Sequence, residues 1–322
     1  METTYLDAIR TAMEEEMARD ERVFLIGEDV GAYGGAFGTS KGLIDRFADR
    51  VIDTPISEIA IVGAASGAAL MGMRPIAEMQ FIDFITCAYD ILVNFTATNR
   101  YLYGRACPLV VRGPAGGGVH GGPFHSLNPE AMFMNRPGLK IVSPGTAYDA
   151  KGLLKAAIRD DDPVLFIEHK YLYRRIKEEL PADDYIVPIG KANVRRKGKD
   201  LTIITWSAMI YVAEEAAEVL AKDGVSVEIL DLRSIIPFDE EAILNSVAKT
   251  NRVIILHEAP LTGGAGAEFA ARIAEKAFEY LDAPVKRVAS LDVPTPYSPP
   301  LEAAWLPNKD KVLTAARELL RY

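Results

Sequence analysis

Cysteine, histidine and long apolar runs are all scarce in this chain of 322 residues. With only two cysteines, a disulfide framework is excluded, and we expect Cys87 and Cys107 to be packing residues in a reducing compartment. No run approaches the roughly 18 apolar residues that a membrane-spanning helix needs. The first residues also lack the charged-then-apolar pattern of a secretory signal. We therefore expect a cytoplasmic protein with no membrane partner.

Clusters of lysine and arginine are missing as well. The formal net charge is −9, whereas sequence-independent binding of nucleic acid needs basic side chains gathered against phosphates. We therefore expect no nucleic-acid partner. What is present, 49% hydrophobic and 25% charged residues, is typical of a globular protein.

Strand and helix patterns alternate through both halves of the chain, and the length favours two domains. Such alternation predicts parallel sheets covered by helices, so the expected fold is α/β with two doubly wound domains. A polar segment with two prolines, residues 171–199, predicts a linker, and we place the domains at 1–185 and 186–322. We also expect one long helix over 84–103. The expected strands are 22–26, 76–79, 108–112, 139–143 and 164–168, then 201–205, 225–230, 252–256 and 285–288.

The segment DTPISEIAIVGAASGAALMGMRPIAEMQFIDF, residues 53–84, is the most distinctive stretch. Pro55 stops any preceding helix, and glycine and alanine then repeat at helical spacing, which suits close approach of another backbone or a flat ligand. Glu58 stands at the start of this helix. It is either a solvated first-turn charge that favours the helix dipole or a functional carboxylate. The apolar neighbours Ile56 and Ile59–Val62 predict burial, and a buried carboxylate needs a partner.

Three other glycine-rich stretches differ in how well they suit ligand binding or catalysis. GEDVGAYGGAFG at 27–38 and GGAGAEF at 263–269 lack the glycine spacing of phosphate and dinucleotide loops. GPAGGGVHGGPFHSLNPE at 113–130 holds two of the four histidines. Glycine lets a backbone approach a ligand, and histidine exchanges protons near neutral pH, so this loop is a candidate for chemistry. The other histidines, His169 and His257, lie beside strands, and we expect them to be structural.

Several separated motifs occur in the order typical of one family. They are TPISE at 54–58, GAASGAALMGMRPIAEMQFIDF at 63–84, the HS pair that begins at His125, and SPGTAYDAKGLLKAAIRDDDP at 143–163. Over essentially the whole chain they resemble the beta subunits of thiamine-diphosphate-dependent 2-oxo acid dehydrogenases, the decarboxylating components of the pyruvate and branched-chain complexes. Acetoin dehydrogenase is a near relative. The resemblance implies a thiamine-diphosphate pyrimidine-binding domain followed by a transketolase C-terminal-like domain.

The resemblance implies roles for individual residues of the cofactor site. Glu58 matches the glutamate that bonds the aminopyrimidine ring of thiamine diphosphate, and a proton shared with that ring promotes loss of the cofactor's weakly acidic thiazolium proton. Ile56, Gln80 and Phe84 are the other expected cofactor-binding residues. Gln80 and Phe84 follow a strand end, where open α/β sheets bind ligands. Core packing is the alternative for Phe84.

His125 matches the family's active-site histidine, which contacts the substrate-derived part of the intermediate. Leu127 stands where the family usually has glutamine, so the contacts around the HS pair depart from the pattern. His120 matches less well, and an incidental loop histidine is the alternative. Glu28 and Asp29 lie in a region that is near the cofactor and the subunit interface in the family, which makes them weaker candidates.

The resemblance implies that another chain binds the metal ion of the cofactor. The family pattern binds Mg²⁺ and pyrophosphate through a GDG motif and a later asparagine, and no GDG occurs in these 322 residues. The resemblance therefore implies an alpha subunit that holds Mg²⁺ on its own half of the site. In relatives K⁺ is held by main-chain oxygens, and a solvated helix end is the alternative for the aspartates among the matching positions. These positions are Leu109, Ala157, Ile158, Asp160 and Asp162.

The function implied by the resemblance is that of a beta subunit in an α2β2 heterotetramer. With its alpha subunit it would decarboxylate a 2-oxo acid, pyruvate or a branched-chain one, and acylate the lipoyl group of a dihydrolipoyl acyltransferase. Two alternatives are an acetoin dehydrogenase beta subunit, which the wording of the segment at 73–84 also resembles, and a cofactor-free assembly subunit. Retention of Glu58 and His125 argues against the second alternative.

Overall fold

The chain folds into two compact units. The computed structural model describes residues 2–322. One unit comprises the described residues up to Ala115 together with Met132–Ile189, and the other comprises Gly116–Ala131 together with Gly190–Tyr322. The junction at Ile189 and Gly190 lies inside the polar segment 171–199. Nothing in the sequence predicts that residues 116–131 group with the second unit.

The first unit is built on a parallel sheet in which the strands follow the order β6, β7, β5, β4, β2, β3. Its strands are largely buried and mostly apolar, as expected where helices cover both faces. A separate antiparallel pair joins β1 (Glu2–Thr4) to β8 (Lys177–Glu179). The strands of the parallel sheet are β2 (Val23–Gly27), β3 (Val51–Asp53), β4 (Arg74–Glu78), β5 (Val110–Ala115), β6 (Lys140–Val142) and β7 (Val164–His169).

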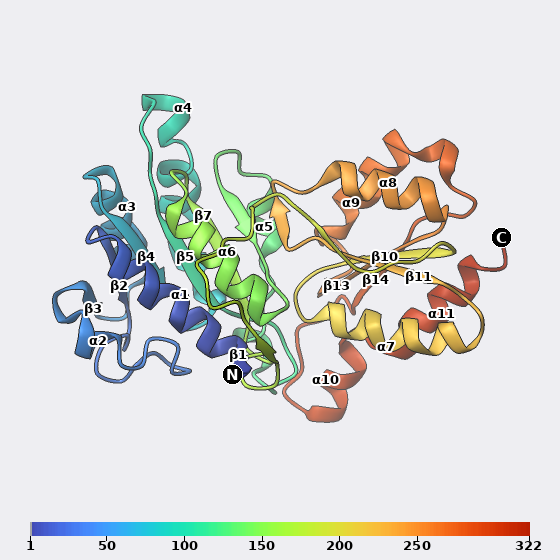
Figure 1. Cartoon of the computed structure of the whole chain (residues 1–322), viewed down its shortest axis with the longest axis horizontal. Coiled ribbons are helices and arrows are strands. Elements are labelled where there is room, and N and C mark those ends of the chain that lie inside the picture. Colours follow the sequence, from blue (N-terminus) through green and yellow to red (C-terminus); the bar gives the residue numbers. More distant parts are fainter. Residues whose placement is uncertain (1) are drawn as a thin grey trace. The chain divides into compact units, whose positions relative to one another are not determined.

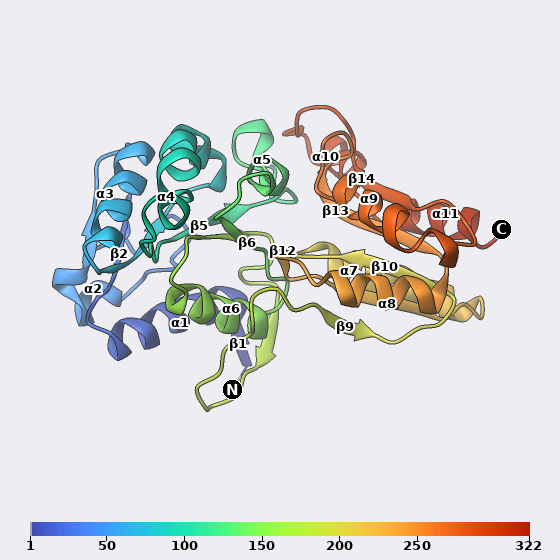
Figure 2. The same cartoon turned by 90° about the horizontal axis from the view of Figure 1, so that it is seen from above.

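Helices cover both faces of this sheet. Figure 2 shows α1 (Tyr5–Arg19) and α6 (Ala147–Arg159) on one face, and α3 (Glu58–Leu70) and α4 (Asn99–Tyr103) on the other. Helix α1 begins after Thr4, whose hydroxyl accepts a hydrogen bond from the Asp7 amide at 3.0 Å and caps the helix. The short helices α2 (Leu43–Arg46) and η1 (Ala48–Arg50) precede β3.

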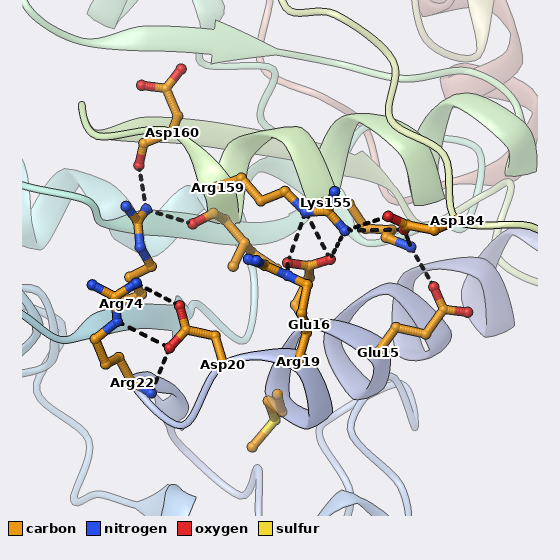
Figure 3. A network of polar contacts seen from close by, with 12 residues as sticks. Glu15, Glu16, Arg19, Asp20, Arg22, Arg74, Lys155, Arg159, Asp160 and Asp184 are labelled. Atoms are coloured by element: carbon orange, nitrogen blue, oxygen red, sulfur yellow. Dashed lines mark hydrogen bonds and ion pairs between the residues drawn. The ribbon is translucent and has the colours of Figure 1, made fainter.

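Ion pairs fasten α1 to α6 (Figure 3). Lys155 Nζ lies 2.5 Å from Glu15 Oε2, and Arg159 Nη2 lies 2.6 Å from Glu16 Oε1. Both cations also contact Asp184, which follows the sheet in sequence. Because Glu16 is fully buried, this network differs from isolated surface pairs, which contribute about 0 to 1 kcal/mol.

The single helix expected over 84–103 is wrong. The chain is helical there, but in three pieces with different hydrogen-bond spacing: the 3₁₀ helix η2 (Ile82–Ala88), the π-helix η3 (Ile91–Thr96) and α4. The Thr96 hydroxyl donates to the Ile91 carbonyl at 2.9 Å. Side-chain hydroxyls that bond the preceding turn compete with the regular helical ladder, which gives a local reason for the irregular spacing.

The second unit has a sheet in the order β14, β13, β10, β11, β9, in which β9 is antiparallel to β11 and the other pairs are parallel. Figure 1 shows α8 and α9 on one face of this sheet and α7 and α11 on the other. Its strands are β9 (Asn193–Arg196), β10 (Leu201–Thr205), β11 (Val227–Asp231), β13 (Val253–Pro260) and β14 (Lys286–Ser290). Its main helices are α7 (Met209–Lys222), α8 (Glu240–Thr250), α9 (Gly266–Lys276), α10 (Pro299–Trp305) and α11 (Lys309–Leu319).

The remaining short elements in residues 2–322 are η4 (Gly122–Phe124), α5 (Glu130–Met134), β12 (Ser234–Ile236) and η5 (Phe278–Tyr280). Both units therefore have the doubly wound α/β form that the sequence predicts. Within residues 2–322, no helix has both the length and the hydropathy to cross a bilayer.

Candidate active site

Four polar side chains gather at the carboxyl edge of the first unit's sheet. Glu28 and Asp29 follow β2, Gln80 follows β4, and Glu58 is the first residue of α3. Gln80 Nε2 donates to Asp29 Oδ2 at 3.1 Å, which links the two strand ends. We call these four residues the acidic strand-end cluster. Ligands of open parallel sheets bind at this edge, so the cluster is the first candidate for the active site.

Glu58 is less buried than its apolar neighbours predict. Ile56 is 81% exposed and Ile59 is 53% exposed, while Glu58 itself is half-buried. The expectation of burial is therefore wrong for this chain by itself. Helix α3 turns Ile61 and Val62 toward the core, which leaves its first turn and its alanine and glycine side open. Within residues 2–322 the Glu58 carboxylate makes no hydrogen bond or salt bridge.

Glu28 is the buried carboxyl of the cluster. Burial raises its pKa, and the negative charges of Glu58 and Asp29 raise it further. The cluster therefore concentrates negative charge beside a carboxyl that is harder to ionise than usual. Such a group holds or passes protons nearer neutral pH than an exposed glutamate does.

A buried charge network lies next to this cluster in the core. Arg112 is fully buried on β5 and donates to Glu168 Oε1 at 2.5 Å and Oε2 at 2.8 Å, and it also pairs with Glu78. The Tyr173 hydroxyl donates to Glu168 Oε2 at 2.5 Å. Burial raises the pKa of Glu78, although Arg112 opposes the shift. We call Glu78, Arg112 and Glu168 the core triad.

Sequence reasoning missed the core triad, although a signal was present. Each member interrupts an otherwise apolar strand: Glu78 ends β4, Arg112 lies in β5 and Glu168 lies in β7. A charged residue inside a buried strand needs an opposite charge nearby, because an unpaired buried charge is very unfavourable. Three such residues in neighbouring strands therefore predict an ion pair network.

The glycine-rich stretch at 27–38 wraps around the cluster. Gly31 donates its amide to Asp53 Oδ1 at 2.7 Å, and a Cβ at Gly31 would overlap the Asp53 carboxylate. Ser40 Oγ donates to the Val30 carbonyl at 2.8 Å. The loop is therefore fixed against the residues that precede Glu58, and glycine is required at position 31 for that close approach.

The expected aromatic residue lies in the same unit. Phe84 is half-buried in η2 and meets Phe81 edge to face, with ring centroids 6.2 Å apart. Phe81 in turn packs edge to face against Phe37 at 5.4 Å. Both readings of Phe84 therefore keep support, because part of its ring packs in the core and part remains accessible.

His125 belongs to the second unit, so the two expected catalytic residues lie in different units. It follows η4 and is half-buried, and its Nδ1 lies 3.3 Å from the Gly121 carbonyl oxygen. The loop closes on itself where the Gly116 amide donates to the Leu127 carbonyl at 3.2 Å. We call residues 116–131 the histidine loop.

The chain matches two family models, one for each part. Residues 1–175 match the pyrimidine-binding domain of transketolase, and residues 190–312 match the transketolase C-terminal domain. The "2-oxoisovalerate dehydrogenase subunit beta" of Bacillus subtilis (strain 168) is 53% identical over 99% of both chains. The chain belongs to the family of 2-oxo acid dehydrogenase beta subunits.

Other comparisons agree with this membership. The "Pyruvate dehydrogenase E1 component subunit beta" of Staphylococcus aureus (strain COL) is 43% identical over 99% of each chain. The mitochondrial protein of that name from Dictyostelium discoideum is 44% identical over 99% of this chain and 91% of its own. A solved structure, "Split gene transketolase, inactive beta4 tetramer", has a TM-score of 0.81, 22% identity and 98% coverage of both chains. The last shows the fold alone. The resemblance and fold class expected from the sequence are thus confirmed.

The beta-subunit family is one of thiamine-diphosphate enzymes, and the matched pyrimidine-binding domain contains the whole acidic strand-end cluster. The residues present fit that ring. Glu58 offers a carboxylate without a partner in the described chain, and the exposed Ile56 lies beside it. A hydrogen-bonding group next to apolar surface suits the edge of a nitrogen heterocycle. The roles of Glu58, Ile56, Gln80, Phe84 and His125 nevertheless stay predictions.

The main-chain carbonyls at three of the expected K⁺ positions, Leu109, Ile158 and Asp160, already accept hydrogen bonds. The Val164 amide donates to the Leu109 carbonyl at 2.9 Å, next to the turn that ends α6. Arg74 donates to the carbonyls of Ile158 and Asp160 at 3.0 and 2.9 Å. Carbonyl oxygens have a second lone pair, so the donor set still fits an ion, but a cation already lies against it.

The remaining K⁺ positions are also engaged. The Ala157 carbonyl accepts from the Asp160 amide at 3.2 Å, and Lys140 Nζ lies 2.6 Å from Asp160 Oδ2. Asp162 pairs with Arg100. Within residues 2–322, no group of three or more His, Cys, Asp or Glu side chains is arranged to hold a metal ion. The K⁺ site and the Mg²⁺ site both stay predictions.

Proposed function

We propose that this chain is the beta subunit of a branched-chain 2-oxo acid dehydrogenase. Support comes from identity, which is 53% to a 2-oxoisovalerate dehydrogenase beta subunit and 43% to a pyruvate dehydrogenase beta subunit at equal coverage. The reaction consumes a 2-oxo acid, a proton and an oxidised lipoyl disulfide. It releases CO₂ and leaves an acyl thioester and a free thiol on the lipoyl group of a dihydrolipoyl acyltransferase.

The chain's own residues have separable tasks in this proposal. Bound thiamine diphosphate supplies the carbon nucleophile and the electron sink for decarboxylation. Glu58 holds a proton at the pyrimidine ring, with Ile56, Gln80 and Phe84 positioning that ring. His125 contacts the substrate-derived group. The observation that carries the proposal is the unpartnered Glu58 carboxylate in the acidic strand-end cluster, at the sheet edge where ligands bind.

The site needs a second chain in this proposal. An alpha subunit supplies Mg²⁺ and the pyrophosphate half, and two copies of each chain form an α2β2 heterotetramer. The open side of α3, where Ala60, Ala64 and Gly67 are exposed, suits close packing against such a partner. The exposed free thiol of Cys87 fits the reducing cytoplasm, where we propose that the complex works. K⁺ at the end of α6 is a further part of the proposal.

Co-expression with an alpha subunit tests the function. The purified pair should reduce an artificial electron acceptor with 3-methyl-2-oxobutanoate, more slowly with pyruvate, and not with acetoin. The chain alone is the control, and calorimetry should detect only weak binding of thiamine diphosphate and Mg²⁺ to it. Preference for acetoin would reassign the chain to the acetoin branch. A well-assembled pair without activity on any of these substrates would contradict the proposal.

A further inference from the structure

Two buried carboxylates of the second unit hold the histidine loop by its backbone. Glu302 on α10 accepts from the Gly118 amide at 2.9 Å and from the His120 amide at 3.2 Å. Glu258 on β13 accepts from the Gly117 amide at 2.6 Å and from Asn128 Nδ2 at 3.1 Å. An ionised carboxylate accepts hydrogen bonds and donates none. The backbone amides of the histidine loop are donors, so they match the two carboxylates.

Glu302 also contacts the imidazole of His120. His120 Nδ1 lies 2.6 Å from Glu302 Oε2, while the His120 side chain is 52% exposed and that of Glu302 is 2% exposed. The ionised carboxylate requires the proton on Nδ1. Nε2 is then the nitrogen left for another partner, and the contact with Glu302 fixes the orientation of the ring.

The backbone of His120 is strained. Its φ is +62°, a conformation that residues other than glycine rarely adopt. Val119 precedes it and Gly121 follows it, and the His120 side chain is half exposed, so core packing does not require a large residue at this position. Strain of this kind persists where surrounding contacts enforce it, and it concentrates at functional sites. Here the enforcing contacts are the bonds to Glu302.

We propose that Glu302 is a positioning residue that presents His120 Nε2, which donates a hydrogen bond when the imidazole is doubly protonated, as a second histidine contact for an oxygen of the 2-oxo acid or of its acyl product. The proposal rests on the proposed function. His125 lies in the same loop, and its Nδ1 meets the carbonyl of Gly121, the residue after His120. Each histidine thus has its Nδ1 against a partner inside the second unit. His120 contacts substrate, and Glu302 acts through His120.

A double-mutant cycle in the co-expressed alpha–beta pair tests the assignment. His120→Asn should lower kcat by about 10- to 100-fold with unchanged affinity for thiamine diphosphate, as expected for loss of one hydrogen bond that involves a charged group. Glu302→Gln should lower kcat by a similar factor. The kcat of the double variant should be no lower than that of either single variant, because both substitutions remove the same contact between His120 and the substrate. Glu258→Gln is the matched control, since it loosens the same loop without touching His120, and its effect should multiply with that of His120→Asn.

The outcomes separate this proposal from the proposed function. Activity of His120→Asn within about twofold of an active wild-type pair would overturn the proposal and leave the function standing. So would independent, multiplying effects of Glu302→Gln and His120→Asn. If Glu302→Gln fails to assemble, His120→Asn and His120→Gln still test the proposal. The His120 side chain is half exposed, so these two variants should fold. In ¹⁵N-histidine-labelled protein, the share of His120 protonated on Nδ1 should fall in Glu302→Gln, because an amide can either accept or donate there, and should be unchanged in Glu258→Gln.

Discussion

The acidic strand-end cluster and the histidine loop are held in place by opposite means. Members of the cluster stand at the ends of β2 and β4 and at the start of α3, so regular elements set their positions. The histidine loop has only η4 as regular structure between residues 116 and 129, and it is held by carboxylates that lie 141 and 184 positions along the chain from the amides they bind. One region depends on sheet register, the other on a few side chains.

The two regions should therefore respond differently to substitution. Displacing the cluster requires the sheet to change, so substitutions beneath it should act on stability. The histidine loop can lose its position while both sheets remain intact, so substitutions of its anchors should act on turnover. Substitutions in each region, and one outside both, test that contrast.

Removing the cation of the core triad should have the largest effect. Arg112→Met leaves Glu78 and Glu168 buried without an opposite charge, and breaking a buried ion pair in this way costs about 3 to 5 kcal/mol. Urea unfolding of the co-expressed pair, followed by circular dichroism, measures the loss. Adding Glu78→Gln and Glu168→Gln to Arg112→Met should recover part of it. A loss below about 1 kcal/mol would show that the triad does not support the sheet.

Removing the acid function at Glu58 should leave folding intact and abolish most activity. Glu58→Gln keeps size and hydrogen bonding but cannot exchange a proton, and such assistance is worth about 100- to 10,000-fold. Hydrogen–deuterium exchange at the thiazolium carbon of bound thiamine diphosphate reports on this step without a substrate. The control is Glu218→Gln, the same change at an exposed position of α7. Exchange within about twofold of wild type would reduce Glu58 to a first-turn helix charge.

A surface ion pair outside both regions should have the smallest effect. A hydrogen bond from Arg22 lowers the pKa of Asp20 to about 2 (Figure 3). The ionised form is therefore favoured in the folded chain, and its contribution is present above the ordinary value near 3.8 and is lost as pH falls toward about 2. Asp20→Asn should cost at most about 1 kcal/mol at neutral pH. Urea unfolding at decreasing pH should show the difference from wild type shrinking below about pH 4, and a constant difference would contradict the assignment.

Local pattern predicted much of the fold and of the cluster. Helix α3, with Glu58 as its first residue, and the longer buried strands follow from periodicity over a few residues. The short strands β1, β3, β8, β9 and β12 were not predicted. The exposure of Ile56 could not be predicted from the sequence, because an apolar residue that a partner chain covers looks the same in sequence as one buried in its own core. The anchoring of the histidine loop could not be predicted either, because its partners Glu258 and Glu302 carry no local signal of which amides they accept.

Helix α3 has a consequence for engineering this protein. A glycine inside a helix costs about 1 kcal/mol relative to alanine, and α3 contains Gly63 and Gly67. A Cβ at Gly67 would meet nothing within 4 Å, and one at Gly63 would meet only Ile91 at 3.9 Å. Nothing in the described chain therefore requires these glycines. Alanine at these two positions would stabilise the single chain but would add bulk to the surface proposed for the partner. Thermal stability of the single chain is therefore a misleading selection criterion at this helix.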